Sequence, residues 1–119
     1  MSSFEQLVEN VHTFVKERDW QVFHTPKNLA LCLSVEASEL LELYQWQIWQ
    51  IDSEAPGGGP PERARVEEEV GDVLISLINF CDAAGIDLIE SAQQKLLQIK
   101  EKYPADSVRG SAVRPKPKS

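Results

Sequence analysis

Apolar residues recur at helical spacing through most of this chain. Between residues 4 and 18 they fall three and four positions apart, which places one apolar stripe on a first helix. Ser2 or Ser3 is the expected cap of this helix, because a serine side chain can accept a hydrogen bond from a free backbone N–H. A turn is predicted at residues 19–26, since Pro26 disfavours helical geometry at the residue before it.

Three further helices are predicted, over residues 27–49, over residues 62–84, and from a capping Asp87 to about Tyr103. The helix at 27–49 is apolar on most sides, and such a helix is usually buried on most sides. In a chain of 119 residues, contacts between subunits are the natural place to bury that surface. No strand-like alternation occurs. The predicted fold is therefore all-α, a four-helix bundle completed by oligomerisation.

Two features of the third helix bear on its packing. Its expected core seam comprises Val66, Val70, Val73, Leu77 and Cys81. A glycine within the same helix, at position 71, costs about 1 kcal/mol relative to alanine. A close approach of another helix, or room for a ligand, would explain that glycine.

A single domain is expected over residues 1–104, followed by a disordered basic tail at 105–119 that is rich in Ser, Pro, Lys and Arg. The net charge is −7, and because the tail is basic, the domain itself is more acidic than this figure shows. An acidic body repels nucleic-acid backbones and anionic membranes, so neither is an expected partner. No apolar run is long enough to span a membrane, and no targeting segment opens the chain. We expect a cytoplasmic protein.

Two pairs of carboxylates stand out in the second and third helices. Glu36 and Glu39 form one pair, and Glu69 and Asp72 form the other. Residues three apart lie about 60° apart around a helix and about 4.5 Å apart along it, so each pair is a fork on one helix face. The first fork lies in a largely apolar helix without a basic residue after Lys27, and an uncompensated buried carboxylate is costly. A cation that prefers oxygen ligands, Mg²⁺ or Mn²⁺, would relieve the repulsion.

Two other sites are excluded by their motifs. A di-iron centre in a helical bundle would need Glu-x-x-His motifs, which are absent from the sequence. The loop at residues 51–61 contains Gly-Gly-Gly but lacks the Lys-Ser/Thr and the preceding strand of a phosphate-binding loop.

The motifs of this chain resemble those of the MazG-like all-α nucleoside triphosphate pyrophosphatases, and within them most of all the dCTP pyrophosphatase branch. The resemblance covers about residues 4–104. It rests on the following segments: Glu17-Arg-Asp-Trp20, Phe23-His24, Pro26-x-Asn28-Leu29, Glu36-Ala-Ser-Glu39-Leu40, Gln45-Trp46, Glu68-Glu69-x-x-Asp72-Val-Leu-Ile75 and Lys102-Tyr-Pro104.

The resemblance implies an enzyme that hydrolyses a dNTP, dCTP or a related or modified nucleotide, to dNMP and pyrophosphate. This would be a house-cleaning activity on the nucleotide pool. The implied catalytic and metal-binding residues are Glu36, Glu39, Glu69 and Asp72, which would hold Mg²⁺ on the phosphates. The implied assembly is a homo-oligomer, with a homotetramer favoured over a dimer.

Substrate-binding candidates come from the same resemblance and from the third helix. Indoles can stack on a base, and amide or imidazole groups can hydrogen-bond to its edge. Lysine and tyrosine side chains of the last helix would approach the triphosphate from a neighbouring subunit. Ser76 and Asn79 continue the carboxylate stripe along the third helix. The full set is Trp20, His24, Asn28, Trp46, Ser76, Asn79, Lys95, Lys102 and Tyr103.

Two positions depart from the family pattern. Ile99 stands where many relatives carry Asn, and Ser76 stands where the dCTP branch often has Tyr. Both departures bear on the base preference and leave the metal ligands untouched. The alternatives are therefore a pyrophosphatase specific for dUTP or another non-standard nucleotide, and a non-catalytic helical interaction module.

Overall fold

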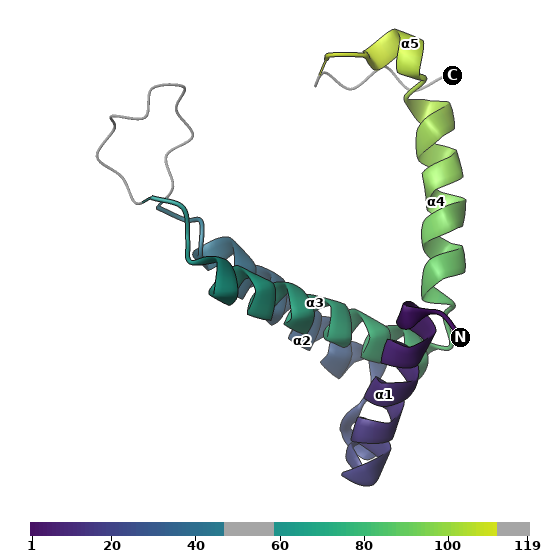
Figure 1. Cartoon of the computed structure of the whole chain (residues 1–119). Coiled ribbons are helices and arrows are strands. Elements are labelled where there is room, and N and C mark those ends of the chain that lie inside the picture. The colour runs from purple at the N-terminus through teal and green to yellow at the C-terminus, as the bar shows by residue number, and fades with distance from the viewer. Residues whose placement is uncertain (47–58, 112–119) are drawn as a thin grey trace. The chain divides into compact units, whose positions relative to one another are not determined.

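The computed structural model describes residues 1–46 and 59–111 of the chain, and over these ranges it is helical without strands. The chain divides into two compact units, Met1–Gly85 and Ile86–Ser119. The all-α fold class is thus confirmed, whereas the single domain over residues 1–104 stays a prediction. The described elements, labelled in Figure 1, are α1 (Ser3–Glu17), the 3₁₀-helix η1 (Trp20–Phe23), α2 (Pro26–Glu42), α3 (Arg63–Ala84), α4 (Leu88–Lys102) and α5 (Ala105–Val108).

Local capping sets most of the helix ends. The Ser2 side chain accepts a hydrogen bond from the Glu5 backbone N–H at 3.1 Å, and the Asp87 side chain accepts one from the Glu90 N–H at 2.9 Å. Both caps were predicted. At the other end of α3, Gly85 adopts a left-handed conformation with φ of 69°, which ends the helix.

The first unit is built around α3. Helix α2 lies alongside α3, and α1 also packs against α3 (Figure 1). His12 Nε2 of α1 lies 3.2 Å from Asp82 Oδ1 of α3, which ties these two helices together. The buried apolar side chains of the described residues are Val11, Val15, Leu29, Ile78 and Cys81. The core is therefore small and lies where α1, α2 and the C-terminal half of α3 meet.

One predicted helix boundary was wrong. Helix α2 ends at Glu42, whereas the sequence predicted a helix to residue 49. Beyond Glu42 the Tyr44 N–H donates to the Leu41 carbonyl at 2.9 Å, a bond between residues three apart that replaces the α-helical spacing of four. Residues 47–49, and most of the predicted 51–61 loop, lie outside the described residues.

Residues 105–111 of the predicted disordered tail are described, and Ala105–Val108 form a short helix, α5. Its first turn follows Pro104, whose carbonyl accepts from the Ser107 N–H at 3.0 Å. The Arg109 N–H then donates to the Ala105 carbonyl at 3.0 Å, which completes one α-helical turn. The rest of the predicted tail, from residue 112 onward, lies outside the described residues.

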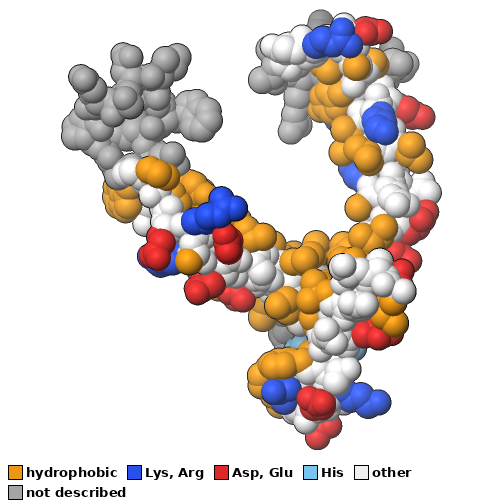
Figure 2. Space-filling view, in the orientation of Figure 1, with side chains coloured by type: hydrophobic (Ala, Val, Ile, Leu, Met, Phe, Trp, Pro, Cys, Tyr) orange, Lys and Arg blue, Asp and Glu red, His pale blue; other side chains and the backbone are white. Residues whose placement is uncertain are grey.

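Much of the apolar surface of α2 and α3 is exposed in the single chain. Leu31, Val35 and Leu41 of α2 are more than half exposed, and Leu29 is the buried residue of that helix. In α3, Val70 is 52% exposed, so its predicted place in a core seam was wrong for the isolated chain. Figure 2 shows apolar side chains at the surface of each unit. None of the described helices is long and apolar enough to cross a membrane.

Replacing Gly71 with alanine is expected to stabilise the chain by about 1 kcal/mol, because alanine is the better helix former. A Cβ atom at Gly71 would meet no other heavy atom within 4 Å, so the close helix approach considered from the sequence is not found among the described residues. Urea unfolding followed by circular dichroism measures the change in the free energy of unfolding. A loss of stability would contradict this expectation.

Candidate functional site

Three carboxylates from α2 and α3 converge in the first unit. Glu36 of α2 and Glu69 and Asp72 of α3 each offer one oxygen, and these oxygens lie within 4.8 Å of one another. Glu36 and Glu69 are half-buried, whereas Asp72 is exposed. The convergence follows from the side-by-side packing of α2 and α3, because each helix presents its acidic fork to the other. Glu39, the fourth predicted ligand, lies beside this carboxylate cluster and lines a cavity together with Glu69.

The carboxylate cluster is electrostatically strained. Burial, together with the neighbouring carboxylates of Glu39, Asp72 and Glu69, raises the pKa of Glu36 to about 7. Burial, followed by the charges of Glu39 and Asp72, also raises the pKa of Glu69. In both cases the surroundings penalise the charged form of the side chain.

Two oxygens of the carboxylate cluster are left without a partner. Glu36 Oε2 and Glu69 Oε2 are hidden from solvent and accept no hydrogen bond from the described residues. An unpaired buried acceptor is costly, and a divalent cation would both coordinate such oxygens and offset the repulsion between carboxylates. Oxygen-only donors suit a hard cation such as Mg²⁺ or Mn²⁺. The donor set therefore fits a divalent metal, and the exposure of Asp72 leaves one side open for further ligands.

A polar cavity of about 490 Å³ adjoins the carboxylate cluster and shares Glu69 with it. The cavity lies between the C-terminal end of α2 and the first turns of α3. Sequence reasoning missed Arg65, the basic side chain in its lining, although a cation one helical turn before Glu69 was the available signal. The lining residues are Glu39, Glu42, Leu43, Gln45, Pro61, Glu62, Arg65 and Glu69.

A second cavity, of about 380 Å³, is mainly apolar and lies between α1, η1 and α3. It brings together three of the predicted substrate-binding residues, namely Trp20, His24 and Asn79. Its other lining residues are Asn10, Val11, Phe14, Val15 and Ile75. The sequence analysis did not single out Asn10, Phe14 or Ile75, because their places in the lining depend on how α1 packs against α3.

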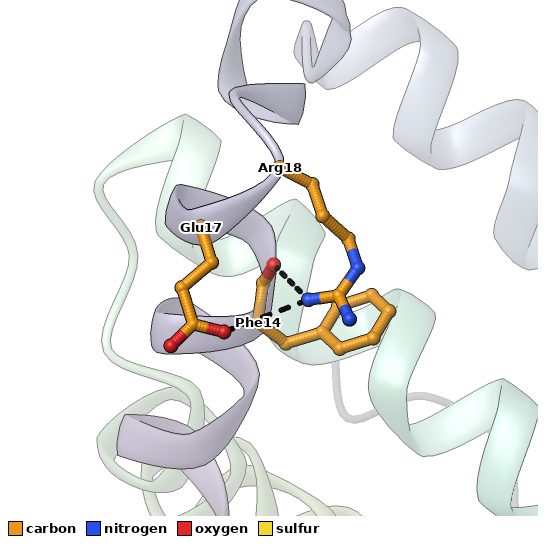
Figure 3. A network of polar contacts seen from close by, with 3 residues as sticks. All are labelled: Phe14, Glu17 and Arg18. Carbon is orange, nitrogen blue, oxygen red and sulfur yellow. Dashed lines mark hydrogen bonds and ion pairs between the residues drawn. The ribbon is translucent and has the colours of Figure 1, made fainter.

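The aromatic wall of this apolar cavity is held by contacts within a short stretch of chain. The rings of Phe14 and Trp20 meet edge to face, with centroids 5.5 Å apart and an interplanar angle of 77°. The Arg18 guanidinium lies 3.7 Å from the centre of the Phe14 ring, and its Nη1 donates to the Phe14 carbonyl at 3.0 Å (Figure 3). Glu17 Oε2 lies 3.7 Å from the same nitrogen. The Phe14 ring is therefore held by Trp20 and by Arg18.

Six of the predicted substrate-binding residues line neither cavity. The Asn28 side chain donates to the Phe23 carbonyl at 3.1 Å, so it closes the turn before α2. Trp46 is 76% exposed and Ser76 is half-buried in α3. Lys95, Lys102 and Tyr103 belong to the second unit, where Lys102 Nζ lies 5.5 Å from the centre of the Tyr103 ring. The substrate roles of these residues stay predictions.

Comparisons with known proteins agree with the helical fold. No family model matches the chain. The chain is 42% identical over 103 residues to dCTP pyrophosphatase 1 of Mus musculus, covering 85% of this chain and 59% of that protein. It is 41% identical over 101 residues to dCTP pyrophosphatase 1 of Homo sapiens, covering 83% of this chain and 58% of that protein. The chain thus spans somewhat under three fifths of the length of these relatives.

A solved structure decides the family. The crystal structure of a pyrophosphatase from Archaeoglobus fulgidus DSM 4304 matches with a TM-score of 0.71 and 37% sequence identity, over 87% of this chain and 94% of that chain. The chain belongs to the MazG-like pyrophosphatase family. The resemblance to MazG-like pyrophosphatases seen in the motifs is thereby confirmed, as is its leaning toward the dCTP pyrophosphatase branch.

Proposed function

We propose that this MazG-like chain is a metal-dependent nucleoside triphosphate pyrophosphatase that cleaves a dNTP between its α and β phosphates. The observation that carries the proposal is the convergence of Glu36, Glu69 and Asp72, whose oxygens lie within 4.8 Å of one another. Such a cluster binds a phosphate chain only through a cation. Both the relatives and the solved neighbour are named pyrophosphatases, which supports the same reaction class.

Mg²⁺ is the proposed cofactor, with Mn²⁺ as the substitute of similar chemistry. Glu36, Glu69 and Asp72 would hold it, and Glu39 would act at the edge of the carboxylate cluster as a further ligand or by orienting water. When bound, the cation polarises phosphoryl oxygens and can supply an activated water. The half-buried Glu36 and Glu69 would hold the cation between α2 and α3, and the exposed Asp72 would leave the triphosphate a way in.

The apolar cavity is the proposed site for the base and sugar. Trp20 and Phe14 offer aromatic surface, and His24, Asn10 and Asn79 offer hydrogen-bonding groups at its rim. The side chains of Asn10 and Asn79 make no hydrogen bond with other described residues, so both are available to a ligand. The named relatives favour dCTP or a modified relative of it as substrate. Because an amide can turn to match either cytosine or uracil, dUTP is the main alternative.

A homo-oligomer is the proposed functional form, a tetramer in preference to a dimer. The exposed Leu31, Val35 and Leu41 of α2 supply apolar surface for such contacts. Lys95, Lys102 and Tyr103 would then reach the triphosphate of a neighbouring subunit. The substrate is a free nucleotide of the cytoplasmic pool, with no nucleic-acid polymer and no membrane as partner, in keeping with the net charge of −7.

A substrate panel tests the proposal. The full chain is assayed for pyrophosphate release from deoxy- and ribonucleoside triphosphates and modified cytidine nucleotides, with Mg²⁺, with Mn²⁺ and with a chelator. We expect metal-dependent release, fastest with dCTP or a modified dCTP, and faster with deoxy than with ribo substrates because a closed pocket excludes the 2′-hydroxyl. Equal rates with dUTP would support the alternative specificity. No release from any triphosphate would reject the enzyme and favour a helical interaction module.

A further inference from the structure

Arg65 is a cation without a partner in an acidic environment. It lines the polar cavity together with the carboxylates of Glu39, Glu42, Glu62 and Glu69. Even so, its guanidinium makes no ion pair or hydrogen bond with any described residue. A guanidinium that faces a cavity and is not neutralised there is available to an anionic ligand.

A nearby arginine shows the contrast. Arg63, two residues earlier on α3, bonds through its Nε to Glu67 Oε1 at 2.8 Å, and it lines neither cavity. Its side chain is 91% exposed. Arg63 therefore forms an ordinary surface ion pair, whereas the exposed Arg65 lines the polar cavity.

The spacing along α3 connects Arg65 to the rest of the site. Arg65, Asp72 and Asn79 are each seven residues apart, which corresponds to about 10.5 Å of rise and a rotation only about 20° short of two full turns. They therefore follow one face of α3. Asp72 belongs to the carboxylate cluster, Asn79 lines the apolar cavity, and Arg65 lines the polar cavity. The carboxylates thus lie between an aromatic compartment and one that contains an arginine.

The groups of a nucleoside triphosphate follow the same order as the apolar cavity, the carboxylate cluster and the polar cavity along α3. Its aromatic base suits the apolar cavity, and the bond to be cleaved must lie at the metal between the two compartments. The β- and γ-phosphates then extend toward the N-terminal end of α3. We propose that Arg65 binds these two phosphates, and hence the pyrophosphate product, in the polar cavity. This inference rests on the proposed function, because it assigns one end of the same substrate.

The carboxylates of the polar cavity limit when Arg65 can act. Without a cation, Glu39, Glu42, Glu62 and Glu69 outnumber the single guanidinium, and a phosphate would be repelled. A divalent metal at the carboxylate cluster would offset part of this negative charge near Glu69. Pyrophosphate binding by Arg65 therefore requires the metal. An arginine can also give phosphate oxygens a fork of two hydrogen bonds, which a lysine cannot.

Inhibition by the two products tests the two ends of the substrate separately, because pyrophosphate comes from one end and the deoxynucleoside monophosphate from the other. In the Mg²⁺-loaded full chain, Arg65→Ala is expected to weaken inhibition by pyrophosphate roughly tenfold or more, the effect expected for a lost hydrogen bond between charged groups. Inhibition by the deoxynucleoside monophosphate should stay unchanged. Arg65→Lys should retain part of the pyrophosphate inhibition, and the matched control Arg63→Ala should change neither. Unchanged pyrophosphate inhibition in Arg65→Ala, or an equal loss for both products, would overturn the inference.

A binding measurement keeps the inference separate from the proposed function. If the wild-type chain hydrolyses no triphosphate, the proposed function fails, and calorimetric titration with pyrophosphate in Mg²⁺ still tests Arg65. Binding by the wild-type chain that is lost in Arg65→Ala and kept in Arg63→Ala would support a pyrophosphate site. Equal binding by all three proteins, or none by the wild type, would overturn it.

Discussion

Asp72→Asn is expected to reduce pyrophosphate release from dNTPs by roughly a hundredfold or more while the helical fold is kept. Residues that merely support a metal ligand already contribute about 10–100-fold to affinity or activity, and Asp72 is proposed as a ligand itself. The amide replaces a charged oxygen in a cluster whose three oxygens lie within 4.8 Å. Steady-state assays at saturating Mg²⁺ measure the loss of kcat/KM.

The matched control for Asp72→Asn is Glu67→Gln on the same helix. Glu67 is exposed and paired with Arg63, away from the carboxylate cluster, so its variant should retain wild-type turnover. Circular dichroism checks that both variants are folded. Full activity in Asp72→Asn would remove Asp72 from the proposed metal site, and equal losses in both variants would point to a general effect of charge.

Mg²⁺ is expected to stabilise the chain strongly at pH 8 and weakly at pH 5. The folded state raises the pKa of Glu36 from 4.5 to about 7, so the folded chain keeps this proton to higher pH than the unfolded chain does. The stabilising contribution of the protonated Glu36 is complete below pH 4.5 and is lost as the pH rises through about 7. The metal-free chain should therefore lose stability over this window, while the cation, which needs the ionised carboxylate, gains affinity.

Thermal unfolding at the two pH values, with and without Mg²⁺, measures this effect. At a free Mg²⁺ concentration one hundred times Kd, the expected gain is about 2.7 kcal/mol. Glu36→Gln serves as the reference, because it removes the titrating group and the repulsion together. It should make the metal-free chain more stable than wild type at pH 8 and should blunt the response to Mg²⁺. Identical stabilisation of wild type at both pH values would refute the role given to Glu36.

Local signals made much of this fold predictable. Ser2 and Asp87 cap their helices through hydrogen bonds that span three residues, so the relevant information lies within one turn. The end of α2 was not predictable in this way, because it depends on what the helix packs against and on the residues that follow it. The apolar pattern therefore predicted too long a helix. Val70 was misplaced for a related reason, since a helical stripe shows which residues are apolar and does not show whether a single chain covers them.

The candidate site was also predictable only in part from the sequence. The acidic forks could be found from sequence because their spacing within each helix is fixed, and only the pairing of α2 with α3 had to be assumed. The cavities could not be found, since each combines side chains from elements that are distant in sequence. Asn10 of α1 and Asn79 of α3 line one cavity, and Arg65 of α3 and Glu39 of α2 line the other. The contact of Asn28 with the turn before α2 was likewise not visible in the sequence, because its side chain donates to the Phe23 carbonyl five residues earlier.

The aromatic wall has a consequence for how substrate choice could change during evolution. Most of the apolar cavity comes from residues 10–24, where Arg18 holds Phe14 and Phe14 meets Trp20. The carboxylate cluster comes from α2 and α3. Under the proposed function, selectivity and bond cleavage are therefore encoded in largely separate stretches of sequence. A lineage can drift toward a new nucleobase through changes in its first twenty-four residues without disturbing the acidic forks.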